Sequence, residues 1–218
     1  MSTSEGRTDT TSLEFTEEMK GYVTFGESDC ERGFREGKQR GTFLMFHLTM
    51  ATDDIDRLIA DRTHEMRAQG WVECEALGGR LPVEHGVFNL FAEGGDPSRT
   101  TMRYRLRFRD GAGNPLTLSG LKEIHDDPGF DLWSDTTTLY VKLIQGHPEI
   151  GGEVSASGII HIYKRDFARQ LTTFRVRGHS AGARVKALAD FGQLFLGQLW
   201  ERYADQATAT ADCEAKET

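Results

Sequence analysis

The chain has few cysteines, and their arrangement gives no disulfide framework. Only three occur among 218 residues, at Cys30, Cys74 and Cys213, and they lie far apart. Disulfide-stabilised secreted domains usually carry a dense and even set of cysteines. The odd number and the wide spacing therefore favour reduced thiols, and we expect a cytoplasmic protein.

Long apolar runs are missing as well. The longest candidate, residues 43–50, is interrupted by His47 and is too short to cross a bilayer as a helix. Residues 1–12 are polar and lack the basic-then-apolar order of a secretory signal. The sequence therefore predicts no membrane span.

Motifs for nucleotides, cofactors and metals are also absent. No glycine-rich dinucleotide fingerprint, phosphate-binding loop or nucleophile elbow occurs in the sequence. The seven histidines never fall at the helical spacing used for zinc, and no Cys-x-x-Cys pair exists. A formal net charge of −8 disfavours a general nucleic-acid partner, because phosphate binding needs a concentrated positive surface. We therefore expect no cofactor, no metal centre and no nucleic-acid partner.

The clearest positive signal is the alternation in residues 100–109, TTMRYRLRFR. Arginine occupies every second position from Arg103 to Arg109, and large apolar residues stand between. Successive side chains of a strand point to opposite faces, so this segment has one apolar and one solvated face. We expect the arginine face to lie outside, paired with acidic residues on neighbouring strands.

Similar segments follow at short spacing, with glycine, aspartate and proline in the connectors that turns require. Eight strands are predicted, over residues 21–26, 42–52, 71–77, 81–92, 100–109, 115–125, 136–145 and 153–163. Such a series predicts a mainly β protein, a single closed or nearly closed antiparallel up-and-down β-barrel of calycin-like form. We expect this domain to span residues 13–203, between disordered tails over 1–12 and 204–218.

Besides these strands, the sequence shows helical periodicity in two regions, one that begins at Asp53 and one after the last strand. Asp53 caps a predicted helix that ends at Gly70 and plugs one end of the barrel. Its expected buried residues are Ile55, Leu58, Ile59 and Met66. The polar, glycine-bearing stretch 27–41 is predicted to be a loop.

Two C-terminal helices are predicted after the last strand. The first rests on the spacing of Phe167, Leu171 and Phe174, and Ser180 caps the second. The second is expected to pack on the outside of the barrel, with a lid or an oligomer contact as alternatives. Its apolar stripe is Val185, Leu188, Phe191, Phe195 and Leu199.

A barrel of this size has an interior wide enough for side chains and one small ligand. The apolar strand positions therefore predict a container for a hydrophobic molecule. The residues expected to bind it are Leu44, Phe46, Leu48, Met102, Leu106, Phe108, Trp133 and Tyr140.

Tyr104 is the best candidate for chemistry, because it lies on the apolar face of the clearest strand. A buried phenol needs a hydrogen-bonding partner, which is either another side chain or the ligand. The sequence leaves four partners open, namely Glu123, His125, Tyr140 and His161. The predicted catalytic set is Tyr104 with Glu123 and His161.

Other polar residues are interpreted as structural. His47 is expected to be a satisfied core histidine, and Glu73 and Glu75 are expected on the outer face of their strand. Residues 126–135 contain four aspartates, which either bond to nearby backbone in a turn, with Trp133 plugging a barrel end, or hold a cation.

Three stretches resemble a known module: FNLF at 88–91, LSGLKEIHDDPGFDLW at 118–133 and SDTTTLYVKL at 134–143. The module is found beside sterol-oxidase-like members of the glucose–methanol–choline oxidoreductases, and the resemblance covers about residues 13–203. It implies no catalytic residues, and this sequence lacks the flavin domain that oxidase activity requires. In architecture the predicted barrel also resembles calycins and allene oxide cyclase-like proteins, which bind lipids or close reactive chains into rings without a cofactor.

These features predict a cofactor-free cyclase or isomerase for a polyketide- or lipid-like substrate, working through conformational constraint. One alternative is a non-catalytic sterol or lipid carrier barrel, and another is a structural or interaction protein with a filled interior. A homo-oligomer formed through the C-terminal helix is a further expectation.

Overall fold

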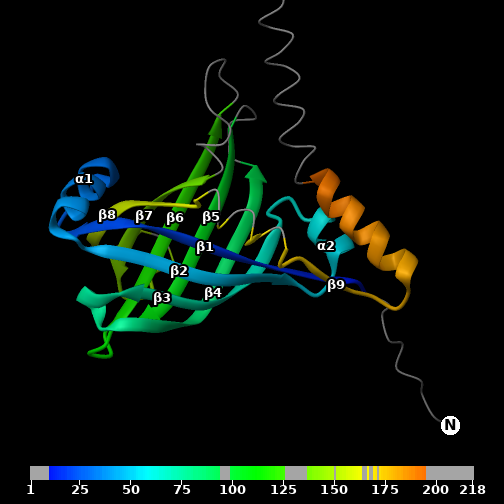
Figure 1. The fold of residues 1–218 in the computed structure, drawn as a ribbon, viewed down its shortest axis with the longest axis horizontal. Coiled ribbons are helices and arrows are strands. Elements are labelled where there is room, and N and C mark those ends of the chain that lie inside the picture. The colour runs from blue at the N-terminus through cyan, green and yellow to red at the C-terminus, as the bar shows by residue number, and fades with distance from the viewer. Residues whose placement is uncertain are drawn as a thin grey trace, which may run out of the picture.

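The computed structural model describes residues 10–93, 99–125, 137–149, 151–163, 166, 169–170 and 172–194. Eight antiparallel strands follow one another around a closed wall in chain order (Figure 1). β1 closes the barrel by pairing with both β2 and β8. The strands are β1 (Ser12–Phe25), β2 (Phe43–Thr52), β3 (Glu65–Cys74), β4 (Gly79–Glu93), β5 (Arg99–Arg109), β6 (Pro115–His125), β7 (Thr138–Gln145) and β8 (Val154–His161). The predicted antiparallel up-and-down barrel is confirmed, and a short ninth strand, β9 (Arg175–Arg177), adds to the start of β1.

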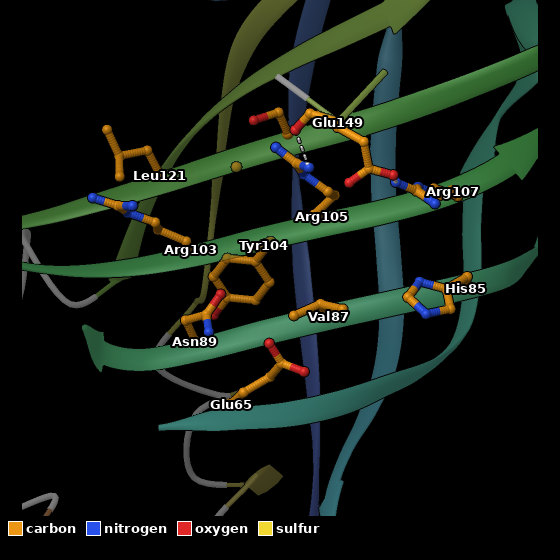
Figure 2. A pocket seen from close by; sticks show the side chains of 12 residues that line it. Glu65, His85, Val87, Asn89, Arg103, Tyr104, Arg105, Arg107, Leu121 and Glu149 are labelled. Atoms are coloured by element: carbon orange, nitrogen blue, oxygen red, sulfur yellow. Dashed lines mark hydrogen bonds and ion pairs between the residues drawn. The ribbon is translucent and has the colours of Figure 1, made fainter. Parts of the chain in front are cut away.

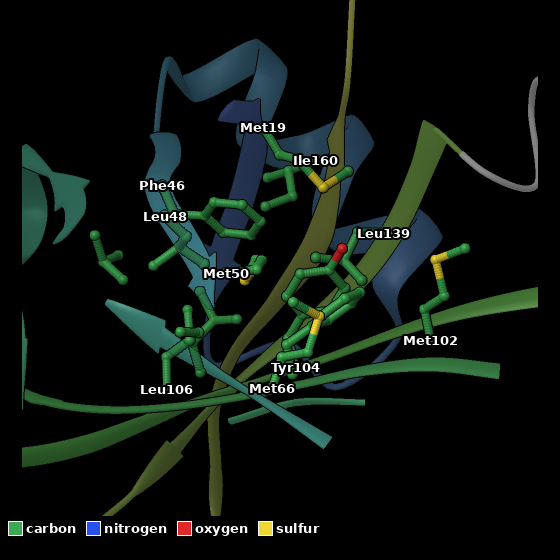
Figure 3. Packing of buried hydrophobic residues seen from close by; sticks show 14 of the residues in the cluster. Met19, Phe46, Leu48, Met50, Met66, Met102, Tyr104, Leu106, Leu139 and Ile160 are labelled. Atoms are coloured by element: carbon green, nitrogen blue, oxygen red, sulfur yellow. The ribbon is translucent and has the colours of Figure 1, made fainter. Parts of the chain in front are cut away.

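The alternating side chains of β5 point to opposite faces of the wall, as predicted. Its even-numbered residues from Met102 to Phe108 are buried in the barrel interior, and the arginines between them face outward. Inward residues of the other strands complete one continuous hydrophobic cluster (Figure 3). Burying each large apolar side chain stabilises the fold by roughly 1.5–3 kcal/mol, so this cluster drives barrel closure.

β1 is longer than the predicted strand at 21–26. It begins at Ser12, and its odd-numbered residues from Leu13 to Val23 point inward. The alternation is hidden in the sequence because Glu17 occupies an inward position between Phe15 and Met19, where an apolar residue is expected. Because this charged residue stands on the buried face, the first half of β1 resembles a polar segment instead of an alternating strand.

The predicted loop at 27–41 is wrong, because this segment forms helix α1 (Cys30–Arg40). Asp29 caps the helix, its side chain accepting a hydrogen bond from Arg32 N. The buried face consists of Gly33 and Gly37 instead of an apolar stripe. A Cβ atom at these positions would lie 2.2 and 2.3 Å from backbone oxygens of β8 and β1. The glycines thus let α1 lie directly on the outside of the wall, a contact that hydrophobic periodicity does not reveal.

The plugging helix exists but is short. α2 (Ile55–Ala60) is capped by Asp54 instead of Asp53, and Ile55 and Leu58 join the core. Met66, expected on this helix, belongs to β3, whose alternating buried residues compete with the helical pattern. Gly70 is a strand residue with φ +150°, where a Cβ would lie 2.0 Å from the His47 carbonyl oxygen.

Residues 181–194 form the C-terminal helix, with the predicted cap: Ala183 N donates to Ser180 Oγ at 3.1 Å. The predicted stripe is wrong in part, because Val185 and Leu188 are 69% and 50% exposed. Phe191 is buried as predicted, whereas Ala187 and Leu194, which were not in the predicted stripe, are buried and packed against the core respectively. Phe195 and Leu199 lie outside the described residues.

One barrel end is closed by elements from both halves of the chain, α2 and the C-terminal helix (Figure 1). Lys186 of the C-terminal helix lies 3.5 Å from Asp56 of α2. Phe174, expected on a helix, instead precedes β9 and stacks on Phe15 at 5.0 Å, while Phe191 lies 6.0 Å from Phe15. Phe167 and Leu171 lie outside the described residues. No helix in the described ranges is both long and apolar enough for a bilayer crossing.

Candidate functional site

Three ionisable or polar side chains meet inside the barrel. Tyr104 Oη donates a hydrogen bond to Glu17 Oε1 at 2.8 Å, and Lys122 Nζ lies 3.5 Å from the same oxygen. The three residues are only 1%, 4% and 1% exposed. We call Glu17, Tyr104 and Lys122 the interior triad.

Strand register brings the triad together. Each residue occupies an inward position, on β1, β5 and β6 respectively, and Gly120 is the cross-strand partner of Tyr104. The Tyr104 ring lies 5.6 Å from that of Phe46 and 4.7 Å from that of Phe88. Lys122 Nζ also lies 5.3 Å from the Tyr104 ring centroid, within the range of a cation–π interaction. The triad is therefore held in place by close aromatic packing on a rigid wall.

A fourth side chain reaches the triad from the segment after β8. Gln170 Nε2 donates to Glu17 Oε2 at 3.3 Å, whereas its buried Oε1 has no hydrogen-bond partner in the described part of the chain. The neighbouring Thr173 hydroxyl accepts from the backbone N of Thr16 at 2.8 Å. Pairing of β1 with β8 begins only at Lys20. The triad therefore lies beside the part of β1 that precedes its pairing with β8. In that part, side chains such as Thr173 form hydrogen bonds to the β1 backbone.

Burial changes the proton affinities of Tyr104 and Lys122. Desolvation, together with the nearby Glu17 carboxylate, raises the pKa of Tyr104 well above its ordinary value. Desolvation lowers the pKa of Lys122, and the charge of Glu17 opposes this effect. A buried ion pair is often no better for stability than apolar residues of similar volume. Apolar side chains could therefore fill this interior equally well. The protein instead has three groups there that can accept or donate protons, which is typical of functional sites.

Tyr104 lies inside as predicted, but none of its predicted partners with a described side chain does. Glu123 is exposed on the outer face of β6. His161 lies outside the wall, 5.6 Å from the ring of Phe34 on α1. Tyr140, also expected to line the lumen, is 38% exposed, and its hydroxyl is 3.5 Å from Glu31. These placements correct the predicted set.

The errors have one physical cause. Side chains of a strand alternate between faces, so a shift of one residue moves a side chain from the lumen to solvent. On β6 the inward residue is Lys122, and its neighbour Glu123 points out. Glu17 and Lys122 were missed because charged residues were not expected on the inner face. The sequence signal that could have identified them is a charged residue at a position of an alternating segment where an apolar residue is expected.

The other lumen residues are placed as expected. They are buried and belong to the hydrophobic cluster: Leu44, Phe46, Leu48, Met102, Leu106 and Phe108. Trp133 and the acidic segment 126–135 lie outside the described residues, as does the side chain of His125. Within the described ranges no three His, Cys, Asp or Glu side chains cluster as a metal site would require.

Polar residues of the outer wall form a separate surface. His47 is not a core residue: its ring stacks on Trp71 at 4.2 Å, and its Nδ1 lies 3.3 Å from Glu18. Glu73 faces outward as expected and pairs with Arg80 at 3.0 Å. Glu75 lies in a short 3₁₀ helix (Glu75–Leu77).

Three hollows lined by described residues lie on the outer wall or at its rims. The most spacious has a volume of about 700 Å³ and lies on the outer face of β4, β5 and β6 (Figure 2). The interior is instead occupied by its own side chains, among them four methionines: Met19, Met50, Met66 and Met102 (Figure 3).

Comparisons with protein-family models, with curated proteins and with solved structures each gave no match. The resemblance to the oxidoreductase-associated module and to calycins therefore stays a prediction.

Proposed function

We propose that the protein is a cofactor-independent cyclase or isomerase that binds a hydrophobic lipid- or polyketide-like molecule bearing a carbonyl group. The observation that carries this proposal is the interior triad, with Tyr104 Oη 2.8 Å and Lys122 Nζ 3.5 Å from Glu17 Oε1. A base, a hydroxyl donor and an amine in contact within an apolar interior are the groups that proton transfer next to a carbonyl requires.

The proposed reaction begins with proton removal. Glu17 takes a proton from the carbon next to the substrate carbonyl, the electron pair of that C–H bond forms a carbon–carbon double bond, and the π electrons of the carbonyl move onto its oxygen. Tyr104 and Lys122 donate hydrogen bonds to this oxygen as its negative charge develops. Isomerisation follows when the proton returns to a different carbon. Cyclisation follows when the enolate carbon bonds to a second carbonyl, whose oxygen then takes the proton from Glu17.

The apolar wall supplies the remaining catalysis. Methionine side chains are flexible and polarizable, so the four interior methionines can rearrange around a hydrophobic guest. Confining a flexible chain close to its reacting geometry lowers the barrier by removing entropy before the chemical step. This role needs no cofactor.

The methionines also favour a second candidate function, a non-catalytic carrier for a sterol or fatty molecule. An adaptable apolar interior is sufficient for that task. The two functions differ in whether the triad exchanges protons with the guest.

The test uses 2-decanone, an apolar ketone, with the purified protein in D₂O. The proposal expects deuterium to enter the positions next to the carbonyl faster than in buffer, measured by NMR and mass spectrometry. Tyr104→Phe and Glu17→Gln should each slow exchange by at least about 100-fold, the usual contribution of one positioned acid–base group. Glu123→Gln, which alters an exposed carboxylate on the outer face of β6, should leave the rate unchanged.

Two results would contradict catalysis. Saturable binding of 2-decanone with exchange at the buffer rate would identify a carrier. Neither binding nor exchange, with the protein folded, would favour the structural alternative.

We also place this activity in the cytoplasm, which suits the free thiols of Cys30 and Cys74. The exposed Val185 and Leu188 make the C-terminal helix our candidate for contact between copies. Sedimentation of the Val185→Lys/Leu188→Lys variant against the unmodified protein tests that contact.

A further inference from the structure

The hollow on the outer wall differs in chemistry from the lumen, although Tyr104 of the interior triad is among its lining residues. Its floor is the outward face of β4, β5 and β6, and Glu149 lies over one side (Figure 2). Arg103, Arg105 and Arg107 project into it from alternate positions of β5. Residues two apart on a strand are about 7 Å apart, so the three guanidinium groups start from one row along the hollow.

Positive charge gathers here on an acidic protein. The lining contains three arginines and His85 but only two carboxylates, Glu65 and Glu149, although the chain carries a formal net charge of −8. Within the described part of the chain, Arg103 has a hydrogen bond from Nε to the Thr101 hydroxyl and no carboxylate partner. Arg105 donates to the main-chain oxygen of Glu149, and its charge acts on the Glu149 carboxylate without a hydrogen bond to it among the described residues.

Arg107 carries the most specific signal. Its Nη2 is 2.8 Å from Glu149 Oε1, whereas its buried Nε has no hydrogen-bond partner among the residues that the structure describes. The Arg107 side chain is 22% exposed, but that of Glu149 is 84% exposed. An exposed carboxylate gains little from such a pair, so another anion can displace it readily.

We propose that this hollow binds a small organic anion whose phosphate or carboxylate group takes the place of the Glu149 carboxylate. Arg105 and Arg107 bind its oxygens through charge-assisted hydrogen bonds, which guanidinium groups form especially well. The half-buried side chains of Val87 and Leu121 line the same hollow and contact its apolar part. A volume of about 700 Å³ is in the range of small-molecule sites.

The experiment is an NMR titration of the ¹⁵N-labelled protein with phenyl phosphate, benzoate, inorganic phosphate and benzyl alcohol. Phenyl phosphate or benzoate should give saturable shifts at residues 85–89, 103–107 and 147–149. The stronger of the two identifies the preferred acid group. Inorganic phosphate should bind at least about tenfold more weakly, because it lacks the apolar part. Benzyl alcohol, which lacks the charge, should give no saturable shift.

Variants separate this site from general charge attraction. Arg105→Gln/Arg107→Gln should weaken binding by more than about tenfold, since two charge-assisted hydrogen bonds are lost. Glu149→Gln should tighten binding by about two- to fivefold, because the competing carboxylate is removed. Arg109→Gln is the matched control: Arg109 lies on the same face of β5, pairs with Glu84 at 3.2 Å and does not line the hollow. It should leave the affinity within about twofold.

Three outcomes overturn the proposal. They are the absence of saturable shifts with both organic anions, equal affinity in the Arg105→Gln/Arg107→Gln variant, and equal affinity for inorganic phosphate and phenyl phosphate. None of them bears on proton exchange at the interior triad, so the two proposals fail separately.

Discussion

The two faces of the barrel wall hold similar ion pairs under opposite conditions. Inside, Lys122 and Glu17 meet with 1% and 5% of their side chains exposed. Outside, Arg107 and Glu149 meet with 22% and 84% exposed. Water screens the outer pair and hydrates either partner when the other is removed. Water cannot hydrate a member of the inner pair in this way, so Glu17 and Lys122 each depend on the other for a compensating charge.

This difference separates two kinds of polar site. The outer pair can open and exchange its carboxylate for another anion at little cost. The inner pair can act on a guest only through groups that remain in contact, and burial lowers the pKa of Lys122. The two proposals therefore assign reversible anion binding to one side of the wall and proton transfer to the other.

The largest expected effect tests the dependence of the inner pair. Glu17→Ala leaves the Lys122 amine buried without its partner, and we expect the free energy of unfolding to fall by about 3–5 kcal/mol. Urea denaturation followed by circular dichroism measures the loss. Glu18→Ala is the matched control on the outward face of β1, where Glu18 pairs with Lys20 at 2.6 Å, and it should lose about 0–1 kcal/mol. Similar losses in both variants would remove the distinction between the faces.

A double variant shows whether the inner pair is kept for stability. Glu17→Leu/Lys122→Met replaces the pair with apolar side chains, and it should be more stable than Glu17→Ala, because no buried amine is left without its partner. It should also lose the proposed proton exchange. A double variant as unstable as Glu17→Ala would mean that the pair itself stabilises the barrel.

The next effect concerns the phenol. Tyr104→Phe removes the 2.8 Å hydrogen bond to Glu17 and leaves the ring packing in place. We expect a loss of about 1.5–3 kcal/mol, as for a hydrogen bond to a charged group. Tyr163→Phe, at an exposed position, controls for the substitution. Equal unfolding midpoints for the two variants would show that the buried bond contributes nothing.

A smaller effect appears at high pH. The raised pKa of Tyr104 means that the folded protein keeps this proton when the unfolded chain, with an ordinary pKa near 10, loses it. The contribution of Tyr104 is therefore complete below about pH 10. Above that pH, the stability difference between the unmodified protein and Tyr104→Phe should shrink by about 1 kcal/mol per pH unit. Denaturation curves at pH 8, 10 and 11 measure it, and a constant difference would contradict the assignment.

The smallest effect is expected on the outer face. Arg109→Gln breaks a pair whose side chains are about half exposed, so the unfolding free energy should change by less than about 1 kcal/mol. Added salt should reduce even this change. Thermal unfolding at low and high salt provides the check, and a larger loss that persists in high salt would show that this pair is not screened.

Local patterns explain which parts of the molecule could be predicted. β5 and β6 were placed nearly to the residue, because alternation and turn residues are properties of a few neighbours in sequence. α1 was missed because its buried face is Gly33 and Gly37, which carry no hydrophobic signal. The first half of β1 was missed because Glu17 interrupts its apolar row. In each case the deciding contact came from another strand or helix.

The same limit applies to the candidate site. Tyr104 was identified, since its own strand fixes which way it points. Its partner Glu17 lies 87 positions away in sequence, and Lys122 differs from the predicted Glu123 by one position of register. No periodicity within a single strand could select either one.

By itself, the sequence determined a wall of antiparallel strands with an apolar inner face and an arginine row outside on β5, because side chains alternate along every strand. Only the tertiary structure decided that a carboxylate, a phenol and an amine share the interior, and that Arg105 and Arg107 border a hollow under Glu149. These contacts depend on how the barrel closes and on the strand register across it. Both are set by interactions between residues far apart in the chain.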